Sequence, residues 1–293
     1  MKFLIPLFLF FSITLVAQQE GGFDVESERR ETGFERDTGA FVELIDTTPI
    51  EFFHAKNPYV FQFFKDTAIA RFHQYDPALS NDFGHLGNLG SAHHSLLFRN
   101  PEVKQLRMGY HQFDAYKFRI SEHQFYKLNT ALTDVFYSQG NTQEDAYFKA
   151  RFARNFSDGI QLSLNYAKVN QMGNYTHQRV VNTNLSIGLW FQNQKGNWNS
   201  FLTFASNVVT QNDNGGIQTD ELFDSTFSEI RTSIPVQSTT ANTRYQDIAY
   251  SWTNQLDLFK KDSVIQKRKT LLEHKLEFTN RFYKAIEGSA DSD

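Results

Sequence analysis

The sequence predicts an all-β protein, more narrowly an antiparallel transmembrane β-barrel. Three observations support this: apolar residues recur at every second position, the alternating segments are long, and the gaps between them alternate between short and long. The pattern is clearest between residues 144 and 210, which hold four such segments. A strand that crosses a bilayer at a tilt needs about 9–11 residues, and barrels join their strands by short turns on one side and longer loops on the other.

The full pattern predicts about nine barrel strands. Side chains alternate between the two faces of a strand, whereas a helix would need apolar residues three and four positions apart. Two short strands, at 59–64 and 69–75, are expected before the barrel. The expected barrel strands are 94–99, 109–118, 132–139, 146–153, 160–167, 184–191, 198–210, 247–259 and 269–283.

One face of these strands is too charged to contact lipid. A Lys or Arg at the lipid midplane costs about 2–4 kcal/mol in a barrel, so the charged face is expected to line a wet interior. A two-sheet sandwich has the same two-residue period, but its strands are usually nearer ~5–6 residues. The residues expected inside are Lys149, Arg151, Gln161, Asn165, Thr253, Gln255, Asp257, Glu273, Lys275, Glu277 and Arg281.

The first 17 residues read as a secretory signal peptide. Lys2 gives a positive start, residues 3–16 are apolar, and Ala17 suits cleavage. The expected organisation is a signal peptide (1–17), a flexible periplasmic segment (18–43), a lead-in region (44–92) and a partial outer-membrane β-barrel (93–293). The connections after 160–167 and 198–210 are the longer ones, so the mature N-terminus is expected on the periplasmic side.

Composition excludes several classes of protein. The 293 residues carry a net charge of -4, which argues against nucleic acid as a partner. With no cysteine, disulfides and cysteine-based metal sites are excluded. The mean hydropathy of -0.49 agrees with a barrel, because only every second strand residue contacts lipid. An aromatic content of 15% suits the girdles found at membrane interfaces.

The sequence predicts no catalytic, cofactor-binding or metal-binding residues. Gly84, Gly87 and Gly90 do not have the spacing of a dinucleotide loop, and no amphipathic helix follows them. His93 and His94 are adjacent, so on a strand they point to opposite faces. The segment 212–216 lacks the residue order of a calcium loop.

Several short segments together resemble the putative porin family of Bacteroidota outer membranes. They are FHQYDP (72–77), HLGNLGSA (85–92), YSQG (137–140), GNY (173–175) and NDNGGI (212–217), in the family's order and at similar separations. The resemblance covers the chain from about residue 45 onward. It implies an outer-membrane barrel without enzymatic activity, in contact with lipid and small hydrophilic solutes, and the interior residues above would then line its pore.

Two questions stay open at this point. Members of the family are usually about twice as long, and nine is an odd strand count. We therefore interpret the chain as the N-terminal half of a larger porin, with a small complete barrel of about eight to ten strands as the alternative. The expected function is passive diffusion of small hydrophilic solutes; the alternative is a non-transport subunit of an outer-membrane assembly. A homo-oligomer or a periplasmic partner fits either interpretation.

Overall fold

The computed structural model describes residues 50–63, 82–98, 110–140, 142–156, 159–222, 231–257 and 271–287. The chain divides into two compact units, Met1–Asp46 and Thr47–Asp293, and all the described residues belong to the second unit. The expected signal peptide, the periplasmic segment 18–43 and the expected strand 69–75 lie outside the described residues.

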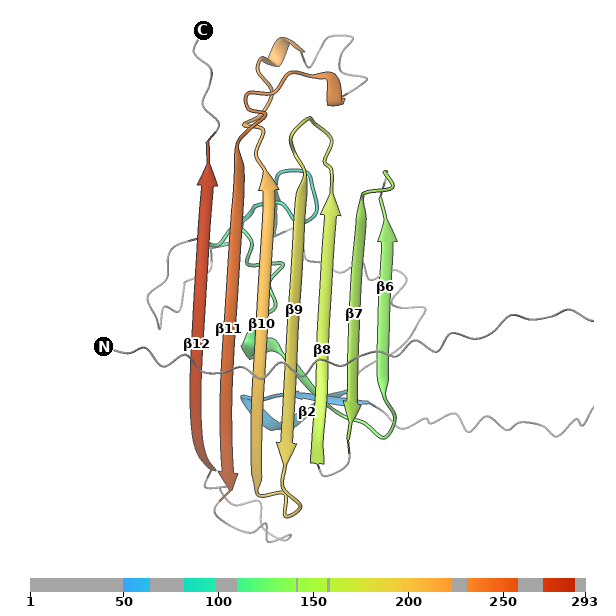
Figure 1. Cartoon of the computed structure of the whole chain (residues 1–293), viewed down its shortest axis with the longest axis vertical. Coiled ribbons are helices and arrows are strands. Elements are labelled where there is room, and N and C mark those ends of the chain that lie inside the picture. The colour runs from blue at the N-terminus through green and yellow to red at the C-terminus, as the bar shows by residue number, and fades with distance from the viewer. Residues whose placement is uncertain are drawn as a thin grey trace, which may run out of the picture. The chain divides into compact units, whose positions relative to one another are not determined.

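Seven strands form one antiparallel sheet, the large sheet, in which each strand pairs with the next along the chain (Figure 1). Every strand expected from residue 132 onward is confirmed as a strand of this sheet, although residues 258–259 and 269–270 lie outside the described residues. β9 and β11 begin earlier than expected, because the residues from Val180 and Asn242 onward also pair with neighbouring strands. The strands are β6 (Leu132–Gln139), β7 (Ala146–Asn155), β8 (Ile160–Gln171), β9 (Val180–Gln192), β10 (Trp198–Asn212), β11 (Asn242–Asp257) and β12 (Leu271–Ile286).

The large sheet is open within the described residues. Its edges are β6 and β12, so the all-β antiparallel fold is confirmed, whereas closure into a barrel is not seen. Short turns join β7 to β8 and β9 to β10 at one end, and the long connection 213–241 leaves the other end (Figure 1). The described parts of that connection, 213–222 and 231–241, contain two short 3-10 helices, η3 (Asp220–Leu222) and η5 (Arg231–Ser233).

The turn between β9 and β10 shows why the chain reverses there. The amide oxygen of Asn193 accepts hydrogen bonds from the backbone N–H groups of Asn197 and Trp198, both at 3.1 Å. Gly196 has a φ of 67°, a conformation that favours glycine. A side chain that mimics a backbone turn and a left-handed glycine together specify a tight reversal.

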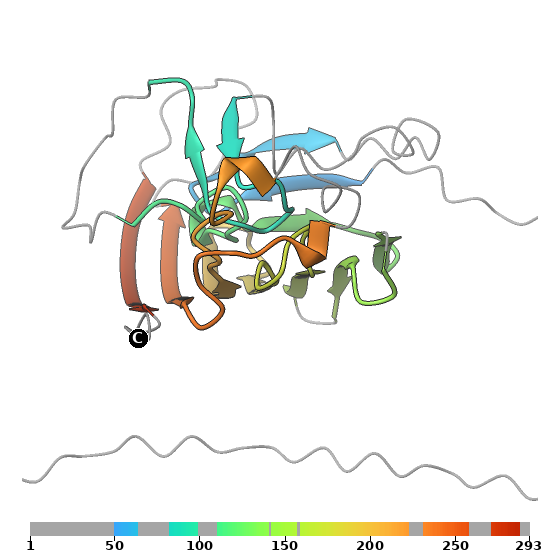
Figure 2. The ribbon, with the colours of Figure 1, turned by 90° about the horizontal axis from the view of Figure 1, so that it is seen from above.

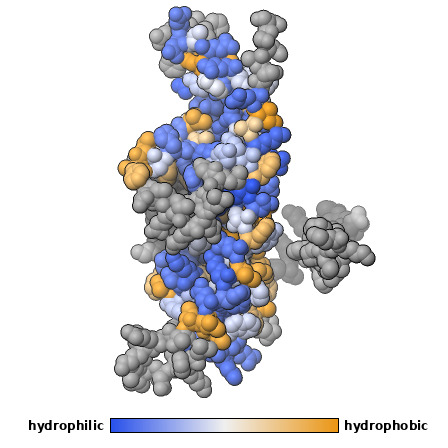
Figure 3. Space-filling model, turned by 90° about the vertical axis from the view of Figure 1, so that its left-hand side faces the viewer, coloured by the Kyte–Doolittle hydropathy of each residue, from blue (hydrophilic) through white to orange (hydrophobic). Residues whose placement is uncertain are grey.

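One face of the large sheet, the outer face, is apolar across its width. In the register, two neighbouring rows of paired residues cross five strands without a charged side chain. Many of these side chains are exposed, and seen from the β12 side, hydrophobic side chains gather along one margin (Figure 3). The rows are Leu162, Leu189, Leu202, Trp252 and Leu276, then Leu164, Ile187, Phe204, Tyr250 and Phe278.

The opposite face, the inner face, is covered by residues 50–63, 82–98 and 110–127, which we call the inner layer (Figure 2). It contains a three-stranded sheet in the order β2-β1-β5, a small hairpin of β3 and β4, and a 3-10 helix. These elements are β1 (Glu51–His54), β2 (Asn57–Phe63), β3 (Phe83–His85), β4 (His93–Ser95), η1 (Ile120–Glu122) and β5 (Gln124–Lys127).

The inner layer replaces two of the expected barrel strands. The prediction of a barrel strand at 94–99 is wrong, because β4 ends at Ser95 and pairs only with β3. The prediction of a strand at 109–118 is also wrong, since residues 110–118 form turns and irregular structure on the inner face. The expected strand at 59–64 is confirmed as β2 but belongs to the inner layer.

Aromatic side chains join the inner layer to the large sheet. Phe53 and Phe125 pack against Trp190 and Phe201, and the rings of Phe53 and Trp190 meet edge to face with centroids 4.9 Å apart. A second cluster packs Phe113 against residues of β9, β10 and β11. Such pairs contribute about 0.5–1.5 kcal/mol beyond the area that they bury.

Gly188 of β9 lies where the inner layer packs tightly against the large sheet. A Cβ atom built there would lie 2.2 Å from Nε2 of His123 and 2.9 Å from the Phe125 ring. We predict that Gly188→Ala lowers the free energy of unfolding by about 1–3 kcal/mol, as overpacking does, and loosens the inner layer. Urea unfolding of the folded protein measures this.

The control for this substitution is Leu189→Val, which alters the neighbouring outward-facing side chain. We expect it to leave the inner layer in place. An unchanged midpoint for Gly188→Ala would contradict the close packing of His123 against β9.

Candidate functional site

Amide side chains of the large sheet bind the irregular backbone of the inner layer. The Oδ1 atom of Asn207 accepts from Phe118 N–H at 2.8 Å, and its Nδ2 donates to Phe118 C=O at 3.1 Å. Asn184 donates to the Tyr116 carbonyl at 2.9 Å, and Gln211 accepts from Ala92 N–H at 2.8 Å. Buried backbone groups must be paired, and these side chains provide the hydrogen-bonding partners that a neighbouring strand would otherwise provide.

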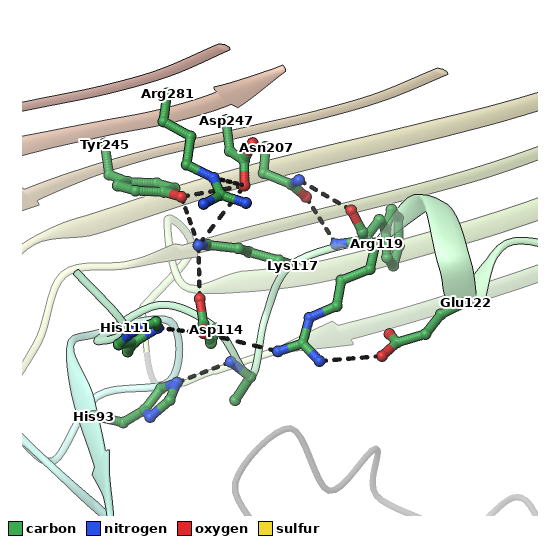
Figure 4. Close-up of polar contacts among 12 residues, drawn as sticks. His93, His111, Asp114, Lys117, Arg119, Glu122, Asn207, Tyr245, Asp247 and Arg281 are labelled. Atoms are coloured by element: carbon green, nitrogen blue, oxygen red, sulfur yellow. Dashed lines mark hydrogen bonds and ion pairs between the residues drawn. The ribbon is translucent and has the colours of Figure 1, made fainter. Parts of the chain in front are cut away.

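A chain of charges ties the same segment to β11 and β12 (Figure 4). The Lys117 ammonium lies 2.7 Å from Asp114 and 3.8 Å from Asp247, and it donates to the Tyr245 hydroxyl at 2.5 Å. Arg281 reaches the same Asp247 oxygen at 3.5 Å. The Lys117 side chain is only 7% exposed. Removing one member would leave a buried charge without its partner, which is costly.

The balance of effects on Asp114 favours its ionised form. Burial raises its pKa, but the hydrogen bond and charge of Lys117, helped by His111 and Arg119, outweigh burial and hold this pKa below its usual range. The carboxylate therefore stays negative and available to Lys117 down to low pH.

His123 is buried and neutral, and its side chain bridges the two layers by hydrogen bonds. Its Nδ1 lies 2.6 Å from Ser186 Oγ and its Nε2 lies 2.7 Å from Ser163 Oγ. The Ser163 hydroxyl donates to Gly188 C=O, so it must accept from His123 Nε2–H, and Nδ1 accepts from Ser186. Burial, with a smaller effect of His54, lowers the pKa of His123 to about 3.

A polar cavity remains between the inner layer and the β7 side of the sheet. Its volume is about 280 Å³, near the lower end of the ~300–1,000 Å³ range of ligand pockets. The inner layer contributes Phe118, Arg119, Glu122, His123 and Gln124, and the large sheet contributes Asp134, Lys149, Ala150, Arg151, Asn165 and Ser186.

The comparison with protein families decides what kind of protein carries this sheet. A family model described as "Putative porin" matches residues 51–292. The chain belongs to this porin family. The comparisons with curated proteins and with solved structures each found no match.

The register places all the sequence-predicted interior residues of this porin chain on the inner face. Their surroundings differ. Lys149, Arg151 and Asn165 line the cavity. By contrast, Gln161, Thr253 and Gln255 are covered, with exposed fractions of 2%, 4% and 0%.

Gln255 and the residues near the β12 edge take part in local interactions. Gln255 donates to Ala55 C=O at 2.9 Å and to Glu273 at 3.0 Å. Lys275 and Glu277 form an ion pair at 2.6 Å. Asp257 is the last residue of β11. A pore-lining role stays a prediction for the whole set.

The sequence did not identify the inner-layer half of the cavity. The alternating segment 109–118 resembles a barrel strand and ends just before these residues. No sequence pattern therefore identified Arg119, Glu122, His123 and Gln124 as cavity-lining. The sequence did contain one indication that protein covers the inner face. Trp190 occupies a position on the polar face of β9, and Tyr245 occupies one on the polar face of β11. Large aromatic side chains on that face indicate a packed surface.

The residues that the structure describes hold no group of three or more His, Asp or Glu side chains placed to bind a metal ion. No helix in this part of the chain is long and apolar enough to cross a membrane.

The low pKa of His123 predicts acid-sensitive stability. In the unfolded chain a histidine takes up a proton below about pH 6.5, whereas folded His123 stays neutral to about 3. Stability contributed by the neutral ring is therefore complete above pH 6.5 and is lost as the pH falls toward 3. Between about pH 7.5 and pH 5 the expected loss is about 2 kcal/mol.

Urea unfolding at the two pH values measures this loss. His123→Gln should unfold more easily at neutral pH but show a flatter pH dependence, because the amide does not titrate. His85→Gln, at an exposed position, is the control. Equal pH dependence in His123→Gln and the unsubstituted protein would contradict the assignment.

Proposed function

We propose that the chain forms part of an outer-membrane β-barrel porin, through which small hydrophilic solutes diffuse passively. One observation carries the proposal: the large sheet is apolar across its outer face, whereas its inner face carries polar and charged residues beside the aromatic clusters that pack against the inner layer. A barrel wall is expected to differ between its two faces in this sense. Membership of the porin family supports it. No catalytic role is part of the proposal.

The proposal includes a location and an orientation. Residues 1–17 direct export, residues 18–43 stay in the periplasm, and the connection 213–241 lies at the outer side. The short turns at the opposite end of the large sheet support this orientation, since barrels have short periplasmic turns.

The proposed wall needs strands beyond the seven described. Backbone groups at an unpaired sheet edge cost several kcal/mol each in lipid, and β6 and β12 are such edges. We infer that both edges pair with further strands of a complete barrel.

A non-transport subunit is the second candidate function. The covered inner face favours it, because Gln161, Thr253 and Gln255 are buried and leave less room for solute. In that role the barrel would anchor the periplasmic segment or the outer loop for another protein.

Conductance of the full-length protein in planar lipid bilayers distinguishes the two functions. The porin proposal predicts ohmic channels in potassium chloride. A folded, membrane-inserted protein with no conductance would favour the non-transport role. Heat-modifiable migration in detergent gels provides the control for folding.

The outer face provides a separate test of membrane insertion. Phe204 lies in the middle of β10 within an apolar row. We predict that Phe204→Arg costs about 2–4 kcal/mol of folding free energy in lipid. Gln246→Arg faces the same side near the loop end of β11 and should cost about 0–1 kcal/mol.

Unfolding in lipid vesicles measures both variants. Equal costs for Phe204→Arg and Gln246→Arg would contradict a lipid-facing belt centred on these rows.

A further inference from the structure

The inner layer covers the large sheet unevenly. On β9, β10 and β11 the inward-facing residues are buried along nearly the whole strand. On β7, Lys149 and Arg151 are only half-buried, and β12 is exposed along most of its length. Among the described residues, space on the inner face is therefore restricted to the two sides of the sheet.

Over β9–β11, specific hydrogen bonds and an ion pair hold the inner layer on the large sheet. Asn184, Asn207 and Gln211 bind the backbone of the inner layer, and Lys117 inserts beside Asp247. His123 links the layer to Ser163 and Ser186. A solute could pass over β9–β11 only by breaking several of these contacts together.

The β7 side differs because the layers separate there. The cavity lies between residues 118–124 of the inner layer and the strands β6 to β9, and charged side chains line it from both sides. Lys149 and Arg151 stand two residues apart on the same face of β7, and Arg119 faces them from the inner layer. Two carboxylates, Asp134 and Glu122, also line it, and Glu122 pairs with Arg119 at 3.2 Å. Lys149 and Arg151 together with Asp134 therefore leave the wall with a net positive charge.

On the β12 side, charges of both signs pair within the strand or with β11. Lys275 contacts Glu277, and Glu273 accepts a hydrogen bond from Gln255. The inner layer also reaches this side, where the rings of Tyr110 and Tyr283 stack with centroids 4.0 Å apart.

We propose that solutes pass the inner layer on its β7 side, and that Lys149 and Arg151 make this passage selective for small anionic solutes. The inference rests on the proposed diffusion function and adds a path and a charge preference to it. A fixed positive charge in a narrow, low-dielectric passage raises the local concentration of anions.

The test uses the absence of cysteine from the chain, which allows a single site to be labelled after folding. Lys149→Cys is introduced into the full-length protein, and the chloride-to-potassium permeability ratio is measured from reversal potentials in planar bilayers. The channel is then modified with a cationic or an anionic methanethiosulfonate reagent. We expect the substitution to lower the ratio several-fold, the cationic reagent to restore it and the anionic reagent to lower it further.

Lys275→Cys is the matched control, because it exchanges another inward-facing lysine, on β12, outside the cavity. The proposal predicts a much smaller change there. The proposed path would be overturned by a conducting channel whose chloride-to-potassium permeability ratio does not depend on the charge at position 149. An equal change of this ratio at position 275 would overturn it as well. An inserted protein that does not conduct would instead overturn the diffusion function on which the path rests.

Discussion

The structure depends on how the backbone of the inner layer is satisfied. Residues 110–118 contain no strand or helix, yet they lie against the large sheet, where unpaired amides would be costly. Asparagine side chains of β9 and β10 supply partners within this segment, and Gln255 of β11 does the same for Ala55 elsewhere in the inner layer. The polar inner face therefore serves first to provide hydrogen-bonding partners for the backbone of the inner layer.

This arrangement gives the polar residues of the sheet two different roles. Near β9–β11 they bind protein, and Gln255 is an example, since its amide holds the Ala55 carbonyl. Near β7 they face a cavity, as Lys149, Arg151 and Asn165 do. A two-residue polar period therefore identifies the inner face of the large sheet, but it does not say whether water or protein occupies that side.

The sequence was sufficient to predict the wall but not what lies inside it. Strand β6 was predicted with its observed bounds, because alternation is a local property of the chain. Residues 110–118 alternate in a similar way, but their partners Asn184 and Asn207 are distant in sequence, and alternation carries no information about them. The cavity was half predicted for the same reason: β7 supplied Lys149 and Arg151, whereas Arg119 and Glu122 come from the inner layer, beside and within η1.

Amide hydrogen exchange of the membrane-embedded protein tests the central claim most directly. Phe118 and Ala92 lie outside the large sheet, and their N–H groups donate to Asn207 and Gln211. An inner layer docked on the sheet predicts strong protection of both amides from exchange. The protection of Phe118 should be lost in Asn207→Ala. It should be kept in Ser206→Ala, which changes the neighbouring outward-facing residue. Exchange of Phe118 and Ala92 at the rate of an unstructured loop would contradict it.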